Sequence, residues 1–197
     1  MHPQVLITPL CGPPQSYLEL VGRSVQKTFG LSTCIKTLIH DIEFAYHFSR
    51  NQYHSTSILE ALDQQALKDY SKILAIADVD LFIPILTHVF GEAQMGGRAA
   101  MISTYRLIDG LPQTDADTVF LNRVIKEALH ELGHTFRLKH CPDPACIMHY
   151  CRSLKDVDHK SPSFCRYCRI LLDEERPPEK NQPASPDCSN LCSSSES

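Results

Sequence analysis

The sequence has no long apolar run and no large excess of charge of either sign. A helix that crosses a bilayer needs about 20 apolar residues, and no stretch approaches that length, so we expect no membrane partner. The formal net charge is −4, which gives no reason to expect nucleic acid as a partner. The first residues, Met1-His2-Pro3-Gln4, lack the positive region of a secretory signal. We therefore expect a cytoplasmic protein.

The composition is that of an ordinary globular protein, apart from its metal-binding side chains. Of the 197 residues, 43% are hydrophobic and 21% are charged, which suits one compact domain with a sizeable core and a small appended lobe. The chain carries nine cysteines and ten histidines. In a reducing compartment, cysteines are better interpreted as zinc ligands or free thiols than as disulfides.

Apolar periodicity predicts a mixture of strands and helices. Short apolar runs and alternating patterns predict strands, and apolar residues three or four apart predict helices. We expect strands at 5–7, 34–42, 73–77 and 96–103, a strand or hairpin arm within 41–52, and a further apolar segment at 81–86. We expect helices over 14–29, ended by Gly30, and from a cap at Ser55 or Thr56 through Ile58, Leu59, Leu62 and Leu67.

The stretch from His130 to His140 carries the strongest chemical signal. His130 and His134 lie four residues apart, so on a helix they share a face and can offer nitrogens to one ion. Glu131 lies one position round. This H-E-x-x-H arrangement is typical of a zinc site in which the two histidines bind the metal and the glutamate is a general base. The motif follows an apolar stripe that predicts a buried helix: Leu121, Val124, Ile125, Ala128, Leu129 and Leu132. Asp117 or Thr118 could cap its start.

A third histidine, His140, can join this site only if the chain leaves the helix. Six further residues would carry it about 9 Å along the axis. The extended zinc motif places a glycine at the bend, where a positive φ is free of steric cost, but this chain has Arg137. A left-handed arginine costs about 1–2 kcal/mol, whereas structural zinc binding in peptides yields about 10–16 kcal/mol. We therefore predict that the bend forms and that the three histidines share a zinc whose bound water is activated by Glu131.

The whole segment from His130 to Cys168, and not only its three histidines, resembles the archaemetzincins, small zinc metalloproteases of the metzincin clan. Cys141 follows His140 directly, Cys146 stands two residues before Met148, and Cys165 and Cys168 form a Cys-x-x-Cys. The segment 90–99 also resembles the family's approach to its edge strand, and the likeness covers roughly residues 3–172.

The resemblance implies an α/β (α+β) metzincin-like zincin fold, with a mixed twisted sheet and an active-site helix in residues 1–140. A small zinc-stapled subdomain would occupy 141–172, with a second, structural zinc held by Cys141, Cys146, Cys165 and Cys168. Met148 would lie beneath the histidines. By likeness to astacin-like metzincins, Tyr150 would approach the zinc and stabilise the oxyanion.

The resemblance also implies a peptide substrate bound in extended form along an edge strand formed by Ala99, Ala100, Met101, Ile102 and Ser103. We expect a monomeric zinc peptidase with two zinc ions per chain. Residues 173–197 are rich in proline, serine and charge and predict a disordered tail. Cys188 and Cys192 in this tail are interpreted as free thiols.

Two other functions compete with this reading. In the first, zinc only holds the fold of an inactive peptide-binding protein; the missing glycine at Arg137 favours it, and Glu131 argues against it. The second, a zinc-ribbon nucleic-acid binder, lacks a basic patch. Cys151 and His159 are spare ligands. His40, His47, His54 and His88 are unclustered and are expected to be structural or exposed. Side-chain preference, and the choice between amino-terminal and internal cleavage, stay open.

Overall fold

The computed structural model describes residues 4–65 and 70–175, which form two sheets with helices around them. The main sheet has the strand order β2-β1-β5-β8-β7, and a small sheet has the order β3-β4-β6. The strands are β1 (Gln4–Leu10), β2 (Ser32–Ile35), β3 (Tyr46–His47), β4 (Gln52–His54), β5 (Lys72–Ala77), β6 (Leu81–Phe82), β7 (Gly91–Ala93) and β8 (Ala99–Ser103). The helices are α1 (Gln15–Phe29), the 3-10 turn η1 (Glu43–Ala45), α2 (Ser55–Gln65), α3 (Ala116–Thr135), α4 (Leu154–His159) and α5 (Arg166–Glu175).

Four strands of the main sheet are parallel, and only β7 runs antiparallel to its neighbour. The central strands β5 and β8 are apolar on both faces, as parallel strands covered on two sides must be. This is the mixed sheet that the sequence predicts.

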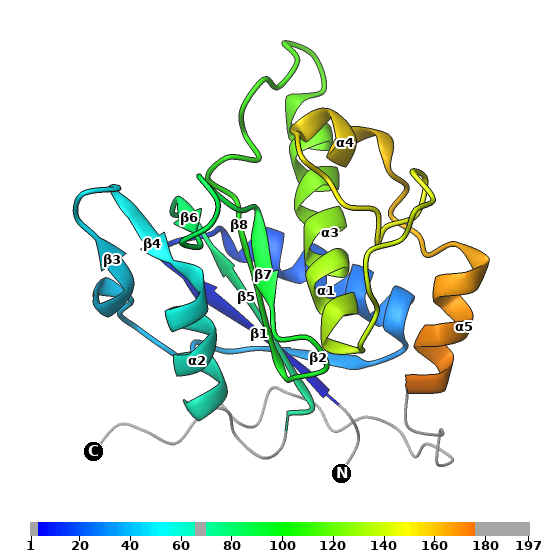
Figure 1. The fold of residues 1–197 in the computed structure, drawn as a ribbon, viewed down its shortest axis with the longest axis horizontal. Coiled ribbons are helices and arrows are strands. Elements are labelled where there is room, and N and C mark those ends of the chain that lie inside the picture. Colours follow the sequence, from blue (N-terminus) through cyan, green and yellow to red (C-terminus); the bar gives the residue numbers. More distant parts are fainter. Residues whose placement is uncertain (1–3, 66–69, 176–197) are drawn as a thin grey trace.

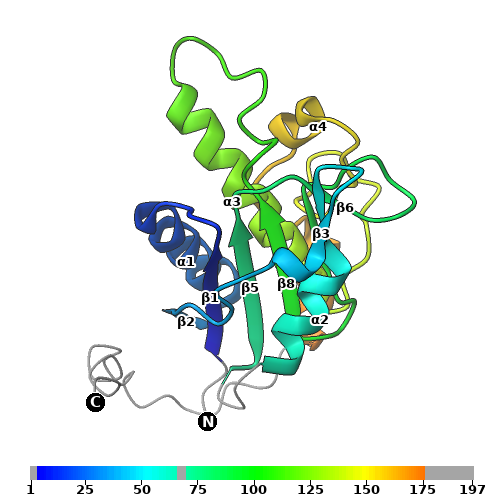
Figure 2. The same ribbon diagram turned by 90° about the vertical axis from the view of Figure 1, so that its left-hand side faces the viewer.

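Helices cover the two faces of the sheet unequally. Figures 1 and 2 show α1 and α3 on one face and α2 on the other. One buried cluster joins Val5 and Ile7 of β1 to α1, α3 and the segment after α3, which includes Ile147 and Met148. A second cluster joins Leu6 of β1 to α2. The site described below lies on α3, so it is built on the more heavily covered face.

The segment after α3 is tied to that helix by two basic side chains. Arg123 forms a two-pronged ion pair with Asp158, at 2.7 and 2.8 Å. Lys126 donates its ammonium protons to the carbonyls of Val157 and Asp158. Both basic residues are buried on α3, so α4 is fixed alongside the active-site helix.

Most predicted elements are confirmed, and three boundaries are wrong. The predicted caps Ser55 and Thr56 lie inside the first turn of α2, and their hydroxyls donate to Glu92. Gly30 ends α1 with a φ of 65°, as predicted. The strand predicted at 34–42 ends at Ile35, because the amide of Leu38 turns to the hydroxyl of Thr8. The predicted caps Asp117 and Thr118 lie inside the first turn of α3, which begins after Asp115.

Several predictions fall wholly or partly beyond the described residues. Leu67, Cys188 and Cys192 lie outside them, as does the predicted tail after Glu175; residues 173–175 belong to α5. The division into subdomains at residue 140 stays a prediction. In the described part of the chain, no helix is both long and apolar enough to cross a bilayer.

The predicted substrate strand needs a correction. Ala99–Ser103 form β8, which is paired with β5 on one side and β7 on the other. All five residues are buried, so this strand has no free backbone edge for a peptide. Within the described residues, the edge of the sheet next to β8 is β7, and the opposite edge is β2.

Candidate active site and metal centres

The last turns of α3 bring His130 and His134 together. The Nδ1 atoms face the carbonyl oxygens of Ile147 at 2.8 Å and of Leu138 at 2.7 Å. A carbonyl can only accept, so each Nδ1 carries the proton and each Nε2 offers its lone pair. The two Nε2 atoms lie 3.2 Å apart. Two lone pairs aimed at each other at this distance repel, unless a cation lies between them.

Arg137 makes the bend that His140 requires. Its φ is 61°, in the left-handed region, and the amide of Leu138 turns back to the carbonyl of Gly133 at 3.3 Å. Nitrogens of the three histidines all lie within 4.8 Å of one another. The arginine thus adopts the conformation for which the extended motif uses glycine.

The replacement Arg137→Gly is expected to stabilise the zinc-loaded protein. It relieves a backbone cost of about 1–2 kcal/mol, part of which is offset by the greater freedom of glycine in the unfolded chain. The ion pair that is lost, with Glu175 at 3.5 Å, is largely exposed and contributes little. We expect the melting temperature to rise by about 2–4 °C. Glu175→Gln removes the same ion pair without changing the backbone and is the control. If Arg137→Gly lowered the melting temperature while Glu175→Gln did not, the backbone cost assigned to Arg137 would be wrong.

The histidine cluster fits a tetrahedral zinc ion. Zinc binds imidazole nitrogen at about 2.0–2.1 Å, so two tetrahedral ligands lie about 3.3–3.4 Å apart, close to the observed 3.2 Å. Burial lowers the pKa of His130 well below its usual value and that of His134 to about 4, and it also lowers the pKa of His140. The three rings are therefore neutral near pH 7, the form that binds a metal.

Glu131 is buried against the edge strand. A Cβ added to Gly91 of β7 would come within 2.6 Å of the Glu131 Cγ, so the glycine leaves room for this side chain. Burial raises the pKa of the Glu131 carboxyl well above its usual value; repulsion from Glu127 raises it further, and Lys160 opposes both. A carboxyl with a raised pKa is suited to accept a proton near neutral pH.

A cleft of about 410 Å³ runs between β7 and α3. Its floor contains Glu131 and the three histidines, and β7 forms part of one wall. Glu92 of β7 also lines the cleft, and its carboxylate accepts hydrogen bonds from the hydroxyls of two α2 residues, Ser55 and Thr56. None of the residues 99–103 lines the cleft, which agrees with the inner position of β8.

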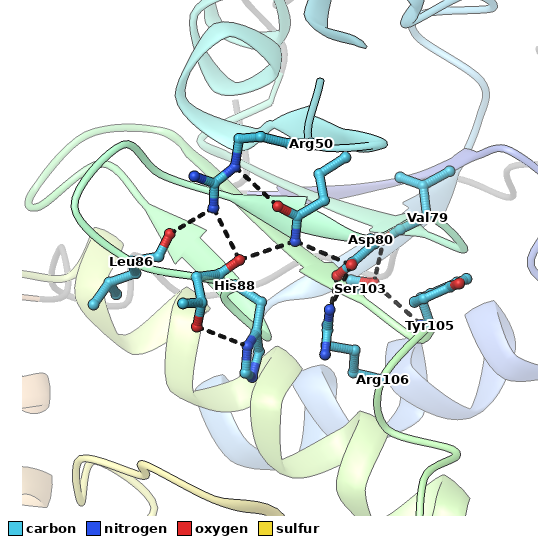
Figure 3. A network of polar contacts seen from close by, with 10 residues as sticks. Arg50, Val79, Asp80, Leu86, His88, Ser103, Tyr105 and Arg106 are labelled. Carbon is cyan, nitrogen blue, oxygen red and sulfur yellow. Dashed lines mark hydrogen bonds and ion pairs between the residues drawn. The ribbon is translucent and has the colours of Figure 1, made fainter. Parts of the chain in front are cut away.

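The wall above β7 is the segment between β6 and β7, residues 83–90, which we call the rim segment. Figure 3 shows how polar side chains hold it: Arg50 donates to the carbonyls of Leu86 and Thr87, and Asp80 pairs with Arg106. His88 lines the cleft from this segment. Burial, followed by the charge of Arg106, lowers its pKa, so it is neutral near pH 7.

The four predicted cysteines form a second cluster. The sulfurs of Cys141, Cys146, Cys165 and Cys168 lie within 4.8 Å of one another. The Cys141 and Cys165 sulfurs are 3.8 Å apart, the separation of about 3.8 Å expected for two tetrahedral ligands at a Zn–S distance of about 2.3 Å. A backbone hydrogen bond from Cys168 lowers the pKa of Cys165, which favours its thiolate. The four cysteines of this cluster form no disulfide.

Met148 and Tyr150 lie where the sequence pattern places them relative to the histidines. The sulfur of Met148 would be 2.6 Å from a Cβ at Gly133, so the buried methionine packs directly under α3. The Tyr150 ring lies 4.9 Å from the His140 ring and is 44% exposed. Tyr150 also lines the cleft.

Several cleft residues have no signal in the sequence. Glu127 and Lys160 form a buried ion pair at 2.8 Å, one helical turn from Glu131. Their 33-residue separation gives no local pattern, although Glu127 and Glu131 share a helix face. The spare ligands Cys151 and His159 belong to neither cluster. Of the histidines expected to be structural or exposed, His88 instead lines the cleft.

Comparisons with known proteins agree with this geometry. Peptidase family M54 matches residues 35–174. The archaemetzincin of Methanopyrus kandleri is 45% identical over 131 residues, 66% of this chain and 71% of that protein. The archaemetzincin of Pyrococcus furiosus is 34% identical over 182 residues, 88% of this chain and 94% of that protein.

Solved structures lead to the same family. The crystal structure of the M. kandleri archaemetzincin has a TM-score of 0.79 at 35% identity, covering 88% of this chain and 95% of that one. A zinc-dependent peptidase from Methanocorpusculum labreanum has a TM-score of 0.75 at 27% identity, covering 85% and 99%. With the family matched over most of its length and its histidine and cysteine clusters formed, the chain belongs to Peptidase family M54, the archaemetzincins, and is a zinc metallopeptidase.

Proposed function

We propose that this protein hydrolyses peptide bonds at a zinc held by His130, His134 and His140, with Glu131 as the general base. The proposal rests on the Nε2 atoms of His130 and His134, which lie 3.2 Å apart. The left-handed turn at Arg137 brings the His140 imidazole to the same place. Zinc in such a site supplies Lewis acidity to a peptide carbonyl and lowers the pKa of water.

The roles of the protein groups follow from their positions. Glu131 takes a proton from the attacking water at a carboxylate oxygen and later gives it to the leaving amine. The carbonyls of Ile147 and Leu138 hold the protons on Nδ1 of the two helix histidines, which keeps both Nε2 atoms available. Gly91 lets the general base lie against the strand where a peptide would bind.

The substrate is an extended peptide that pairs with β7. This strand is one of the two edges of the main sheet within the described residues, and its residues Gly91, Glu92 and Ala93 all line the cleft, whereas no residue of the other edge, β2, does. Main-chain hydrogen bonds to an edge strand give affinity without demanding a particular sequence. We therefore propose that the peptide binds to Gly91–Ala93 and not to residues 99–103.

A second zinc held by Cys141, Cys146, Cys165 and Cys168 has a structural role. Four thiolates leave no open coordination position for water. Because four clustered thiols persist as zinc ligands where disulfides do not form, we propose that the protein works in the reducing cytoplasm. The proposed active form is a monomer with two zinc ions.

Tyr150 is proposed to stabilise the oxyanion that develops on the peptide carbonyl. The replacement Tyr150→Phe is expected to lower kcat about tenfold with little change in KM. This is less than the loss of about 10²–10³ for a buried oxyanion donor, because the side chain is partly exposed. Zinc content should not change. Tyr167→Phe, on the exposed face of α5, is the matched control. Unchanged turnover in Tyr150→Phe would remove this role.

Cleavage profiling tests the proposed function. The zinc-loaded protein is incubated with an unbiased peptide pool, and the products are identified by mass spectrometry. New termini at defined positions, absent after zinc removal and restored by added zinc, support the proposal. Two zinc ions per chain with no cleavage of any peptide would support an inactive binding protein instead.

A further inference from the structure

The rim segment, residues 83–90, forms the cleft wall opposite α3. Its cleft-lining residues are mostly apolar and include Ile83, Leu86 and Val89. Backbone hydrogen bonds hold its carboxyl end: the Val89 amide donates to Leu81 at 3.0 Å, and the Ser103 amide donates to Phe90 at 2.8 Å. Before this anchor the segment makes one turn, with the Leu86 amide donating to Ile83 at 3.0 Å, and side chains from elsewhere in the chain bind its middle.

Arg50 supplies the main support of the rim segment. It lies in the turn between β3 and β4, and its Nη2 donates to the carbonyls of Leu86 at 2.9 Å and Thr87 at 3.0 Å. Its Nε donates to Gln52 at 3.0 Å, and its guanidinium lies 4.3 Å above the Phe82 ring. A planar guanidinium fixed at all these points holds both carbonyls in one orientation.

A partly buried network of hydrogen bonds holds Arg50 in place. The Gln52 amide donates to the carbonyl of Thr87 and to Asp80, both at 3.0 Å. Asp80 accepts two hydrogen bonds of 2.6 Å from Arg106. Burial alone would raise the pKa of Asp80, but hydrogen bonds from Arg106 and Gln52 hold it below its usual value. Figure 3 shows this chain of contacts from the rim segment to the loop after β8.

We propose that Arg50 is a positioning residue for the substrate, because it fixes the wall against which an apolar side chain of the bound peptide packs. This inference rests on the proposed peptidase function. It assigns a role in peptide selection to a residue 80 positions away from the H-E-x-x-H motif. Leu86 makes the contact: its carbonyl is bound by Arg50, and its side chain lines the cleft and is 39% exposed.

The test compares Arg50→Met, which keeps the length of the side chain and removes the guanidinium, with wild type. The probes are the best-cleaved peptide of a positional library and the same peptide with its preferred apolar residue changed to alanine. In Arg50→Met we expect KM for the apolar peptide to rise about tenfold, the scale of a lost charge-assisted hydrogen bond. We expect kcat to change less than about twofold, as for loss of uniform binding. Discrimination against the alanine peptide should fall.

Three further variants separate positioning from general stability. Arg98→Met removes an arginine of similar exposure that pairs with Asp63 on α2, and its KM should match wild type. Arg50→Lys, which cannot make the same fork of hydrogen bonds, should be intermediate. Leu86→Ala, which leaves the Arg50 contacts in place, should also lower the discrimination.

Hydrogen exchange gives a readout that does not need activity. Amides of residues 83–90 should exchange faster in Arg50→Met, with no change in α3. The inference is overturned if KM and discrimination stay at wild-type values, if kcat falls at constant KM, or if exchange of the rim segment is unchanged. If wild type cleaves no peptide, the proposed function fails and this inference falls with it, whereas an active wild type with an unaffected Arg50→Met overturns this inference alone.

Discussion

The replacement Glu131→Gln is expected to lower kcat about 10³-fold, within the range found for loss of a general acid–base group. Glutamine has nearly the same shape, so it keeps the packing against Gly91, but it cannot accept the proton of the attacking water. Glu131 is not one of the clustered metal-binding side chains, so zinc content should stay at the wild-type value. Steady-state kinetics on a cleaved peptide, with zinc measured on the same sample, checks both parts.

A matched control is available on α2. Glu60→Gln makes the same chemical change at an exposed position and should leave kcat and KM unchanged. If Glu131→Gln kept more than about a tenth of wild-type turnover, the loss would be too small for a general base. If it lost zinc, its effect would be on the metal site and would say nothing about proton transfer.

The second large effect is expected from Cys165→Ser. Binding energy at a structural zinc is largely folding energy, so loss of one of four thiolates should reduce zinc from two ions to about one and lower the melting temperature by about 10 °C or more. Cys141 follows His140 directly, and its amide donates to Met148 at 2.9 Å. We therefore predict that the cysteine cluster positions His140, so Cys165→Ser should also weaken binding of the remaining zinc.

The readout of this coupling is the affinity of the histidine site for zinc, measured by competition with a chelator. Cys11→Ser changes an exposed cysteine outside the cluster and should keep two zinc ions. Cys165→His retains a zinc ligand and should recover part of the stability. If Cys165→Ser kept the wild-type affinity at the histidine site, the two centres would be independent and the coupling would be wrong.

Local patterns in the sequence were sufficient for α3 and the histidine cluster, whereas the cysteine cluster was expected from the resemblance to the archaemetzincins. The stripe from Val124 to Leu132 predicts a helix with one buried face, and Val124, Ala128, Leu129 and Leu132 are indeed buried. The spacing of the histidines then limits which nitrogens can meet. The bend at Arg137 could be inferred only by weighing a small backbone cost against metal binding, since the residue itself is a poor marker of a left-handed turn.

Features that depend on distant pairing could not be predicted. Gly91–Ala93 is too short to show an alternating pattern, and the family resemblance alone places the edge strand at the longer segment 99–103. The strand predicted over 34–42 keeps its alternation after the backbone has left the sheet at Ile35. Arg50 and Leu86, or Glu127 and Lys160, lie more than 30 residues apart in the chain and meet only in the fold.

The position of zinc in crystals of the full chain tests the central claim most directly. Anomalous scattering at the zinc edge should give two peaks per chain. One should lie about 2.0–2.1 Å from nitrogens of His130, His134 and His140, and the other about 2.3 Å from the sulfurs of the four clustered cysteines. A His140 ring turned away from the first peak, or no peak between His130 and His134, would contradict the account.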